Sequence, residues 1–241
     1  MKDNTIHILS TRPVSQNILK AAESNNINID VISFIETHEL NDENIYHEID
    51  RLSKLRSAVI FTSMNAVSIV AKHISNVPEW KIYCIGNTTK ELVTKYFGSE
   101  NIAAVGSDSE ELAMKIINDK VSEATFFCGD IRKDYLPKVL INHSINLSEL
   151  VVYKTIETPV KVSTQYSGIL FYSPSAVRSF FSINTIDNYS VLYSIGKTTT
   201  EEIKHHSSNQ IITVENSDKE LMALQMIAQI SELNRNKENN G

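Results

Sequence analysis

The sequence predicts an α/β protein of two similar domains, each a parallel sheet with helices on both faces. Apolar runs that suit buried strands alternate with amphipathic segments that suit helices, which is the pattern of a parallel α/β sheet. Two segments also recur at a spacing of 110 residues (171 − 61 and 193 − 83): Phe61-Thr-Ser-Met-Asn-Ala-Val67 as Phe171-Tyr-Ser-Pro-Ser-Ala-Val177, and Tyr83-Cys-Ile-Gly-Asn-Thr-Thr89 as Tyr193-Ser-Ile-Gly-Lys-Thr-Thr199. A repeat of this length is too long for a solenoid and indicates two domains.

The first elements form a βαβ unit. The pattern of residues 5–11 predicts a buried strand, and Pro13 suits the first turn of the helix that follows. Residues 27–35 return as a second strand, which implies a parallel pair with a right-handed crossover. The charged stretch at 36–56 predicts a connection that contains one short surface helix.

Each recurring segment predicts a strand, a tight turn and a helix. Strands should end at Phe61 and Phe171, with helices beginning after the serine turns that follow. In the other pair of segments, residues 88–91 and 198–201 have the spacing of a capping box, so we expect helices to begin there.

The remaining segments complete the two halves. The first half has a strand at 102–105 and a helix beginning near Asp108. Their counterparts in the second half are a strand near Val214 and a helix beginning near Ser217. A second βαβ unit, offset from the first by 119 residues (153 − 34), has its strand, helix and strand at 125–129, 133–142 and 147–153.

Composition excludes several classes of function. At 241 residues the chain is long enough for two domains of about 100–120 residues each. A net charge of −6 disfavours a general nucleic-acid binder, which normally shows a basic patch. The sequence shows neither an apolar signal core nor a run long enough to span a membrane. We therefore expect a cytoplasmic protein with neither nucleic-acid nor membrane partners. We also expect a monomer with a small-molecule substrate, although composition does not determine either.

Most motifs of conventional catalysis are absent from the sequence. It contains no phosphate loop, no dinucleotide-binding glycine pattern and no nucleophile elbow. Cys84 and Cys128 form neither a disulfide framework nor a zinc pattern, and the histidines show no metal-ligand spacing. We therefore expect no metal and no organic cofactor. Either the protein binds without catalysis, or its chemistry depends mainly on shape and charge.

The turns after the strands are the candidate binding site. In an open α/β sheet, ligands bind at the carboxyl ends of the strands, where the free N–H groups of helix starts favour anions. The candidate contacts in the serine and threonine turns are Ser63, Asn65, Ala66, Thr88, Thr89, Ser173, Ser175, Ala176, Thr198 and Thr199. The alternative is that their side chains only cap helices. Two matched copies of each turn favour a shared binding site.

Three further side chains lie at or after strand ends. Arg12 and Arg132 occupy similar positions, where an arginine either clamps a carboxylate or simply lies on the surface. Tyr153 closes the second βαβ unit, and spacing alone favours core packing with a satisfied hydroxyl for it.

Together these features resemble the uroporphyrinogen-III synthase family of heme biosynthesis. The resemblance is carried by Thr11-Arg12-Pro13, the two recurring segments with their copies, Cys128-Gly129-Asp130 with Arg132, and Leu150-Val-Val-Tyr-Lys-Thr155. These motifs follow one order from residue 6 to about residue 230. Met64 stands where the family commonly has proline, and Thr200 where it commonly has alanine.

The resemblance implies two α/β domains joined by a two-stranded linker. One domain would contain residues 1–34 and 157–241, the other residues 37–154, with crossings at 35–36 and 155–156. Spacing alone is equally compatible with two consecutive domains.

The resemblance also implies a reaction, the cyclisation of hydroxymethylbilane to uroporphyrinogen III with inversion of ring D through a spiro intermediate. The eight substrate carboxylates would bind the helix-start N–H groups, the arginines and the backbone at Gly129. Tyr153 matches the family's candidate general acid, which protonates the departing hydroxyl. The alternative function is a non-catalytic two-domain module that binds an anionic metabolite. A purely structural role leaves the duplicated turns unexplained.

Overall fold

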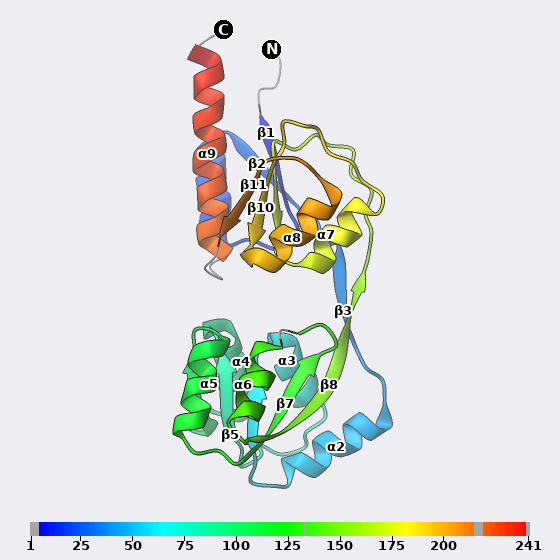
Figure 1. The fold of residues 1–241 in the computed structure, drawn as a ribbon, viewed down its shortest axis with the longest axis vertical. Helices are drawn as coiled ribbons and strands as arrows, with labels where there is room; N and C mark the ends of the chain where they lie inside the picture. Colours follow the sequence, from blue (N-terminus) through cyan, green and yellow to red (C-terminus); the bar gives the residue numbers. More distant parts are fainter. Residues whose placement is uncertain (1–4, 133, 215–218, 240–241) are drawn as a thin grey trace. The chain divides into compact units, whose positions relative to one another are not determined.

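The computed structural model describes residues 5–132, 134–214 and 219–239, with side chains described as far as residue 232. The chain forms two compact units. Unit 1 contains Met1–Glu36 and Glu157–Gly241, and unit 2 contains Thr37–Ile156. The chain therefore leaves unit 1 after its first βαβ segment and returns to it after the second (Figure 1).

Unit 1 is a five-stranded sheet with helices on both faces. Its order is β11-β10-β9-β1-β2, and the neighbouring strands run parallel. The strands are β1 (Ile6–Ser10), β2 (Ile27–Val31), β9 (Gly168–Phe171), β10 (Val191–Ile195) and β11 (Ile211–Val214). Helices α1 (Gln16–Glu23) and α9 (Lys219–Asn239) cover one face, and α7 (Pro174–Phe181) and α8 (Gly196–His206) cover the other (Figure 1).

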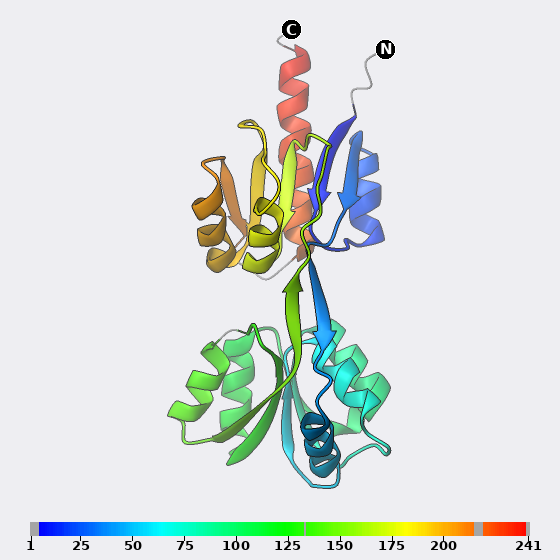
Figure 2. The same cartoon turned by 90° about the vertical axis from the view of Figure 1, so that its right-hand side faces the viewer.

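Unit 2 has the order β3-β8-β7-β4-β5-β6. Its strands are β3 (Ile35–Glu39), β4 (Ala58–Phe61), β5 (Lys81–Ile85), β6 (Ile102–Gly106), β7 (Glu123–Gly129) and β8 (Asn146–Glu157). One face packs against α2 (Glu43–Ser53), α3 (Met64–Lys72) and α4 (Asn87–Phe97), and the other against α5 (Ser109–Asn118) and α6 (Tyr135–Asn142). The one-turn helix η1 (Ser99–Asn101) precedes β6. Figure 2 shows the two sheets from a direction at right angles to Figure 1.

The two sheets share one topology. In unit 1 the βαβ pair β1 and β2 is followed across the sheet by β9, β10 and β11. In unit 2 the βαβ pair β7 and β8 is followed by β4, β5 and β6, with β3 added at the edge. Strand order reverses between β1 and β9 in unit 1 and between β7 and β4 in unit 2. Such reversals are where open α/β sheets form their binding crevices.

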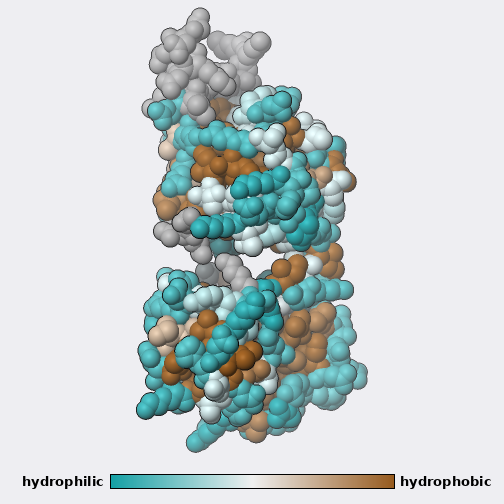
Figure 3. Space-filling model, in the orientation of Figure 1, coloured by the Kyte–Doolittle hydropathy of each residue, from teal (hydrophilic) through white to brown (hydrophobic). Residues whose placement is uncertain are grey.

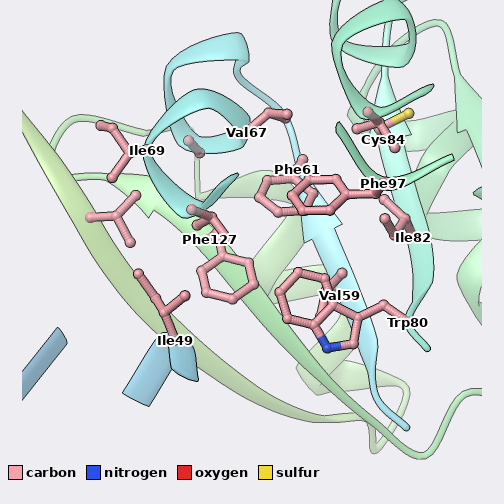
Figure 4. Close-up of a cluster of buried hydrophobic side chains, with 14 of the residues drawn as sticks. Ile49, Val59, Phe61, Val67, Ile69, Trp80, Ile82, Cys84, Phe97 and Phe127 are labelled. Atoms are coloured by element: carbon pink, nitrogen blue, oxygen red, sulfur yellow. The ribbon is translucent and has the colours of Figure 1, made fainter. Parts of the chain in front are cut away.

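Buried aromatic rings fill the core beneath the first serine turn. Phe61, at the end of β4, stacks on Phe97 and Phe127 with ring centroids 5.9 and 5.2 Å away (Figure 4). Trp80 packs against the same rings and donates its indole N–H to the Leu52 carbonyl at 3.0 Å. Burying each such ring contributes roughly 2–3 kcal/mol to the free energy of folding. This packing holds the end of β4 in place where the serine turn begins.

Several expected elements are confirmed. Strands end at Phe61 and Phe171, and Ser63 and Ser173 cap the helices that follow. Asp108 caps α5 by accepting from the N–H groups of Glu110 and Glu111 at 2.9 Å.

Other expectations are wrong. Pro13 lies before α1, which begins at Gln16 with Ser15 as its cap. Residues 27–35 do not form one strand, because β2 ends at Val31 and β3 begins at Ile35 in the other sheet.

The capping boxes predicted at residues 88–91 and 198–201 are wrong as well. Helix α4 begins at Asn87 and α8 at Gly196, and neither has a side-chain cap. Gly86 and Gly196 adopt φ of +79° and +71°, so the glycine turns themselves start these helices. The helix starts expected at Lys133 and Ser217 lie outside the described residues.

The serine-turn helices also hold the strands that carry the chain from unit to unit. Within unit 2, Asn65 donates to Thr37 of β3 at 3.0 Å and Lys72 to Glu39 at 2.9 Å. Within unit 1, Arg178 of α7 donates to Glu157, the last residue of β8, at 2.8 Å. Each serine-turn helix therefore fixes a connecting strand to its own unit.

Hydrophilic side chains cover most of the face shown in Figure 3, and the hydrophobic areas on it are small and separate. Within the described ranges, no helix is both long enough and apolar enough to span a membrane.

Candidate functional site

Several of the candidate site residues lie at the two strand-order reversals. In unit 2, Ser63 follows β4 and Gly129 ends β7, the two strands that flank the reversal. In unit 1, Arg12 follows β1 and Ser173 follows β9. Because parallel strands all end at one edge of their sheet, segments far apart in sequence meet there.

Tyr153, Ser63 and Gly129 form one cluster in unit 2. Tyr153 lies opposite Gly129 in the β7–β8 register, beside an irregularity between Cys128 and Gly129. A Cβ added to Gly129 would lie 2.9 Å from the Tyr153 hydroxyl oxygen and would overlap the ring. The absence of a side chain at 129 therefore makes the space that the tyrosine ring occupies.

The Tyr153 hydroxyl lies near the N-terminus of α3. It is close to the Ser63 hydroxyl, which accepts from the Asn65 N–H at 3.2 Å. Tyr153 is 9% exposed, so its side chain is largely buried. Burial raises the pKa of Tyr153, and the nearby Ser63 side chain acts in the opposite direction. The phenol is therefore protonated at neutral pH and is available as a proton donor.

Asp130 fixes the backbone around Tyr153. Its N–H donates to the Tyr153 carbonyl at 3.0 Å. Its carboxylate accepts from the N–H groups of Ile131 and Thr155 at 2.8 and 2.9 Å. Asp130 carries part of the family resemblance but was not among the predicted site residues. Its position directly after a buried strand is the sequence signal from which Asp130 could have been found.

The two serine turns leave different N–H groups free. In α3 the Ser63 hydroxyl binds the Asn65 N–H, and no partner for the Ala66 N–H exists in the described part of the chain. In α7 the Ser173 hydroxyl binds the Ala176 N–H at 3.2 Å, which leaves the N–H of Ser175. Anions are stabilised at such positive helix ends, but Ala66 is 0% exposed and Ser175 is 4% exposed, so both donors are largely covered by the protein.

The side chains of the serine turns have other functions than the predicted contacts. Ala66 and Ala176 are 0% and 2% exposed and pack into the cores. Asn65 is engaged with Thr37, and the buried Ser175 hydroxyl lies 3.1 Å from that of Ser173. A bulky residue at 66 or 176 would therefore disturb the core.

Each threonine pair divides between surface and core. Thr88 and Thr198 are exposed, whereas Thr89 and Thr199 are 5% and 2% exposed. A Cβ added to Gly86 or Gly196 would meet no atom within 4 Å, so the space above both turns is open. Only the first threonine of each pair is placed where its side chain could contact a ligand.

The two arginines differ, although their positions correspond. Arg132 is ion-paired with Glu149 and donates to Asp134 at 2.6 Å. It is therefore neutralised by its own chain, and the expected clamp at this position is not supported. Arg12 lies over the Tyr172 ring, 5.4 Å from the centroid, and no carboxylate in the described ranges pairs with it. Tyr172 was not among the predicted site residues.

The chemistry available at these edges is anion binding and proton donation. Burial raises the pKa of Cys84 and Cys128 to about 11, so neither is a thiolate nucleophile at neutral pH. Among the described residues, no group of three or more His, Cys, Asp or Glu side chains is arranged to hold a metal ion.

Comparison with known proteins gives concordant matches. The family described as "Uroporphyrinogen-III synthase HemD" matches residues 16–223. An uncharacterised protein of Rickettsia prowazekii (strain Madrid E) is 25% identical over 181 residues, which cover 74% of this chain and 61% of that protein. The chain thus spans less than two thirds of the length of this relative.

Two solved structures share the fold. The uroporphyrinogen-III synthetase of Helicobacter pylori 26695 matches with a TM-score of 0.66 and 15% identity, over 94% of this chain and 100% of that one. A mutant uroporphyrinogen III synthase of the extremely thermophilic bacterium Thermus thermophilus matches with a TM-score of 0.59 and 10% identity, over 95% and 100%.

Proposed function

Because the chain belongs to the uroporphyrinogen-III synthase family, we propose that it cyclises hydroxymethylbilane to uroporphyrinogen III with inversion of ring D. The reaction is that of a cyclising lyase in tetrapyrrole biosynthesis, since water leaves the linear tetrapyrrole as the ring closes. The proposed site lies at the carboxyl edges of the sheets, where the duplicated turns are found.

The first chemical step requires an acid. Protonation of the terminal hydroxyl lets it leave as water, and the electron pair of the neighbouring pyrrole nitrogen forms the azafulvene. The substituted carbon of ring D then attacks this electrophile to give the spiro intermediate. Fragmentation and reclosure at the other α-carbon of ring D, with loss of a proton, give the inverted isomer.

The observation that supports the proposal best is the Tyr153 phenol beside Ser63 at the α3 N-terminus. Burial raises the pKa of Tyr153, so it holds its proton at neutral pH. The nearby Ser63 hydroxyl would stabilise the phenolate left after transfer. Asp130 holds the strand on both sides of it. A phenol is a weak acid at pH 7, so its contribution to the rate is modest.

Positioning supplies the larger part of the proposed catalysis. A flexible linear tetrapyrrole closes in the wrong sense unless its ends are held in a productive geometry. The open backbone at Gly86 and Gly196, and Arg12, which has no carboxylate partner in the described ranges, are suited to its carboxylates. These donors stabilise negative charge without a net basic protein.

One assay tests this function. The protein is supplied with hydroxymethylbilane, and the oxidised products are separated into type I and type III isomers. Type III product from the wild type, with much less from Tyr153→Phe, supports the proposal. Type I product alone, at the rate of the spontaneous reaction, contradicts it. Tight binding of the product without turnover would instead identify a non-catalytic binding module.

The proposal includes activity as a monomer without a metal or organic cofactor. Turnover that survives dialysis against a chelator, and a single species of 27.1 kDa by light scattering, are the expected results.

A further inference from the structure

Strand β8 contains one residue more than its neighbour β7 close to the candidate site. Six successive residue pairs keep one register, the last of them Cys128 with Val151. The next pair is Gly129 with Tyr153, so the register passes over Val152. Val152 is therefore the extra residue of a β-bulge, a feature that bends a strand and re-aims the side chains beyond it.

The bulge determines the face of the sheet on which Tyr153 lies. Side chains alternate between the two faces along a strand, and a shift of one residue reverses the face. Leu150 and Val152 pack into the core cluster beneath α2, α3 and α4, and Val151 packs into the cluster on the other face. Alternation alone would place Tyr153 with Val151, yet Tyr153 packs with Val152. The extra residue thus turns the phenol to the face on which Ser63 caps α3.

The bulge is held from the strands on both sides. Towards β3, the Val152 carbonyl accepts from the Leu40 N–H at 3.0 Å. Towards β7, the Asp130 N–H donates to the Tyr153 carbonyl at 3.0 Å. A regular parallel ladder would continue with the Thr155 N–H donating to the backbone carbonyl of Asp130. The Thr155 N–H donates instead to the carboxylate oxygen Oδ1 of Asp130 at 2.9 Å, so a side chain replaces a backbone acceptor beyond the bulge.

Asp130 also lies where β7 leaves the sheet. Strand β7 ends at Gly129, whereas β8 continues to Glu157. The same oxygen Oδ1 accepts from the Ile131 N–H at 2.8 Å. One carboxylate oxygen therefore joins the departing end of β7 to the continuing strand β8, directly beside the bulge.

The corresponding strand pair of unit 1 provides an internal comparison. Strands β1 and β2 pair in one register over all five residues of each strand. The Ile32 N–H then donates to the Ser10 carbonyl at 3.0 Å, so this ladder ends on a backbone acceptor. Thr11, the residue after β1, donates its hydroxyl to the Leu170 carbonyl of β9 at 2.9 Å. Of these two described strand pairs, only β7–β8 has the bulge and a carboxylate such as Asp130 that holds it.

We propose that Asp130 is a positioning residue: its carboxylate holds the Val152 bulge, which keeps the Tyr153 phenol on the α3 face. In this role Asp130 acts through backbone N–H groups and needs no contact with the substrate. The reaction that the phenol serves rests on the proposed function, whereas the placement of the ring by Asp130 rests on the strands of unit 2.

The experiment compares three substitutions of Asp130 with the wild type. Asp130→Asn keeps an oxygen acceptor at the same reach and removes the charge. Asp130→Glu keeps the charge and moves the carboxylate by one methylene, and Asp130→Ala removes the acceptor. Asp108→Ala is the matched control, because one oxygen of Asp108 also accepts from two backbone N–H groups, at 2.9 Å each. Asp108 lies beyond the end of β6, which β4 and β5 separate from β7.

Two kinds of measurement are needed. The isomer assay gives turnover, and fluorescence titration with uroporphyrin III, the oxidised product, gives affinity. NMR of protein labelled at the ring carbon Cζ of tyrosine follows the phenol independently of activity, with Tyr153→Phe identifying the signal of Tyr153. Because burial raises the pKa of Tyr153, the pH titration of this signal reports whether the ring is still enclosed.

If the inference holds, Asp130→Ala and Asp130→Glu lower turnover about tenfold, as far as Tyr153→Phe does, and leave product affinity nearly unchanged. Asp130→Asn keeps turnover close to that of the wild type. Adding Tyr153→Phe to Asp130→Ala lowers the rate no further, because both changes remove the action of one proton donor. Asp108→Ala lowers the melting temperature about as much as Asp130→Ala, by about 2–5 °C, without a change in turnover.

The NMR titration separates geometry from charge. The pKa of Tyr153 falls towards its ordinary value of 10.0 in Asp130→Ala and stays further above it in Asp130→Asn. Both variants remove the charge of Asp130, which also raises this pKa, so the difference between them reports the position of the ring.

Several results would overturn the inference. Wild-type turnover and an unchanged Tyr153 titration in Asp130→Ala would do so and leave the proposed function intact. Equal losses in Asp130→Asn and Asp130→Ala would assign the effect to charge. A loss of turnover in Asp108→Ala as large as in Asp130→Ala would assign it to stability.

The inference and the proposed function can fail separately. If the wild type forms no type III isomer, the proposed function fails, and the NMR comparison of Asp130→Ala with Asp130→Asn decides the inference by itself. If Asp130→Ala does not fold, Asp130→Asn and Asp130→Glu give the same decision, since the first keeps the geometry and the second keeps the charge.

Discussion

Gly129 and Tyr153 face each other across the β7–β8 pair, and the tyrosine ring occupies the space that any side chain at 129 would fill. The glycine is needed for this close approach, since its backbone does not adopt a positive φ. The relationship links a buried strand end to the phenol that we propose as the acid.

Gly129→Ala should displace the Tyr153 ring. We expect a loss of about 1–3 kcal/mol in the free energy of unfolding from overpacking, together with lower turnover. Urea unfolding and the isomer assay measure the two effects. If Gly129 acts through Tyr153, adding Tyr153→Phe to Gly129→Ala lowers the rate little further. Fully additive losses would show that the two positions act independently.

Tyr153→Phe should lower turnover about tenfold, the small effect expected of a weakly acidic donor, and leave product affinity nearly unchanged. It removes only the hydroxyl and keeps the buried ring. Because the folded pKa of Tyr153 lies above its ordinary value of 10.0, the acid form persists below pH 10, and turnover should show no tyrosine titration between pH 7 and about 9.5. A wild-type rate in the phenylalanine variant would remove Tyr153 from the mechanism.

Met64→Pro should leave activity unchanged and raise the free energy of unfolding by roughly 0.4–1 kcal/mol. Pro174 already occupies this first helical position in α7. Ser63 has φ −142° and ψ 136°, the extended conformation that a residue before proline prefers. Urea unfolding alongside Met64→Ala separates the backbone effect from loss of the side chain. Destabilisation by proline but not by alanine would contradict the equivalence of the two turns.

Arg132→Met should cost about 1 kcal/mol of stability, in the range of a partly exposed ion pair, without changing product affinity. The loss arises because Glu149 and Asp134 lose their common partner. Glu149→Gln is the control, and the two changes together should cost less than their sum. A large loss of affinity in Arg132→Met with unchanged stability would restore the carboxylate clamp predicted from the sequence.

The sequence by itself determined the elements that form through interactions between residues close together in the chain. Apolar runs specified the strands that end at Phe61 and Phe171, and Ser63, Ser173 and Asp108 specified their helix starts through hydrogen bonds within three residues. The 110-residue duplication also followed from sequence, because two copies of one fold keep the same turns in the same order. Family membership followed from that order of motifs.

Only the tertiary structure decided which distant segments meet. The Ser63 and Tyr153 hydroxyls, 90 positions apart (153 − 63), come together because β4, β7 and β8 lie side by side and end at one edge. The helix start predicted from a capping residue was correct at Asp108 and wrong at Thr88. At Thr88 the helix begins earlier, after a glycine with positive φ. Arg12 and Arg132 occupy similar positions in the sequence, yet among the described residues only Arg132 pairs with a carboxylate, because strand β8 brings Glu149 beside it. Pairing between strands and the charges it juxtaposes depend on packing of the whole sheet, which no short stretch of sequence contains.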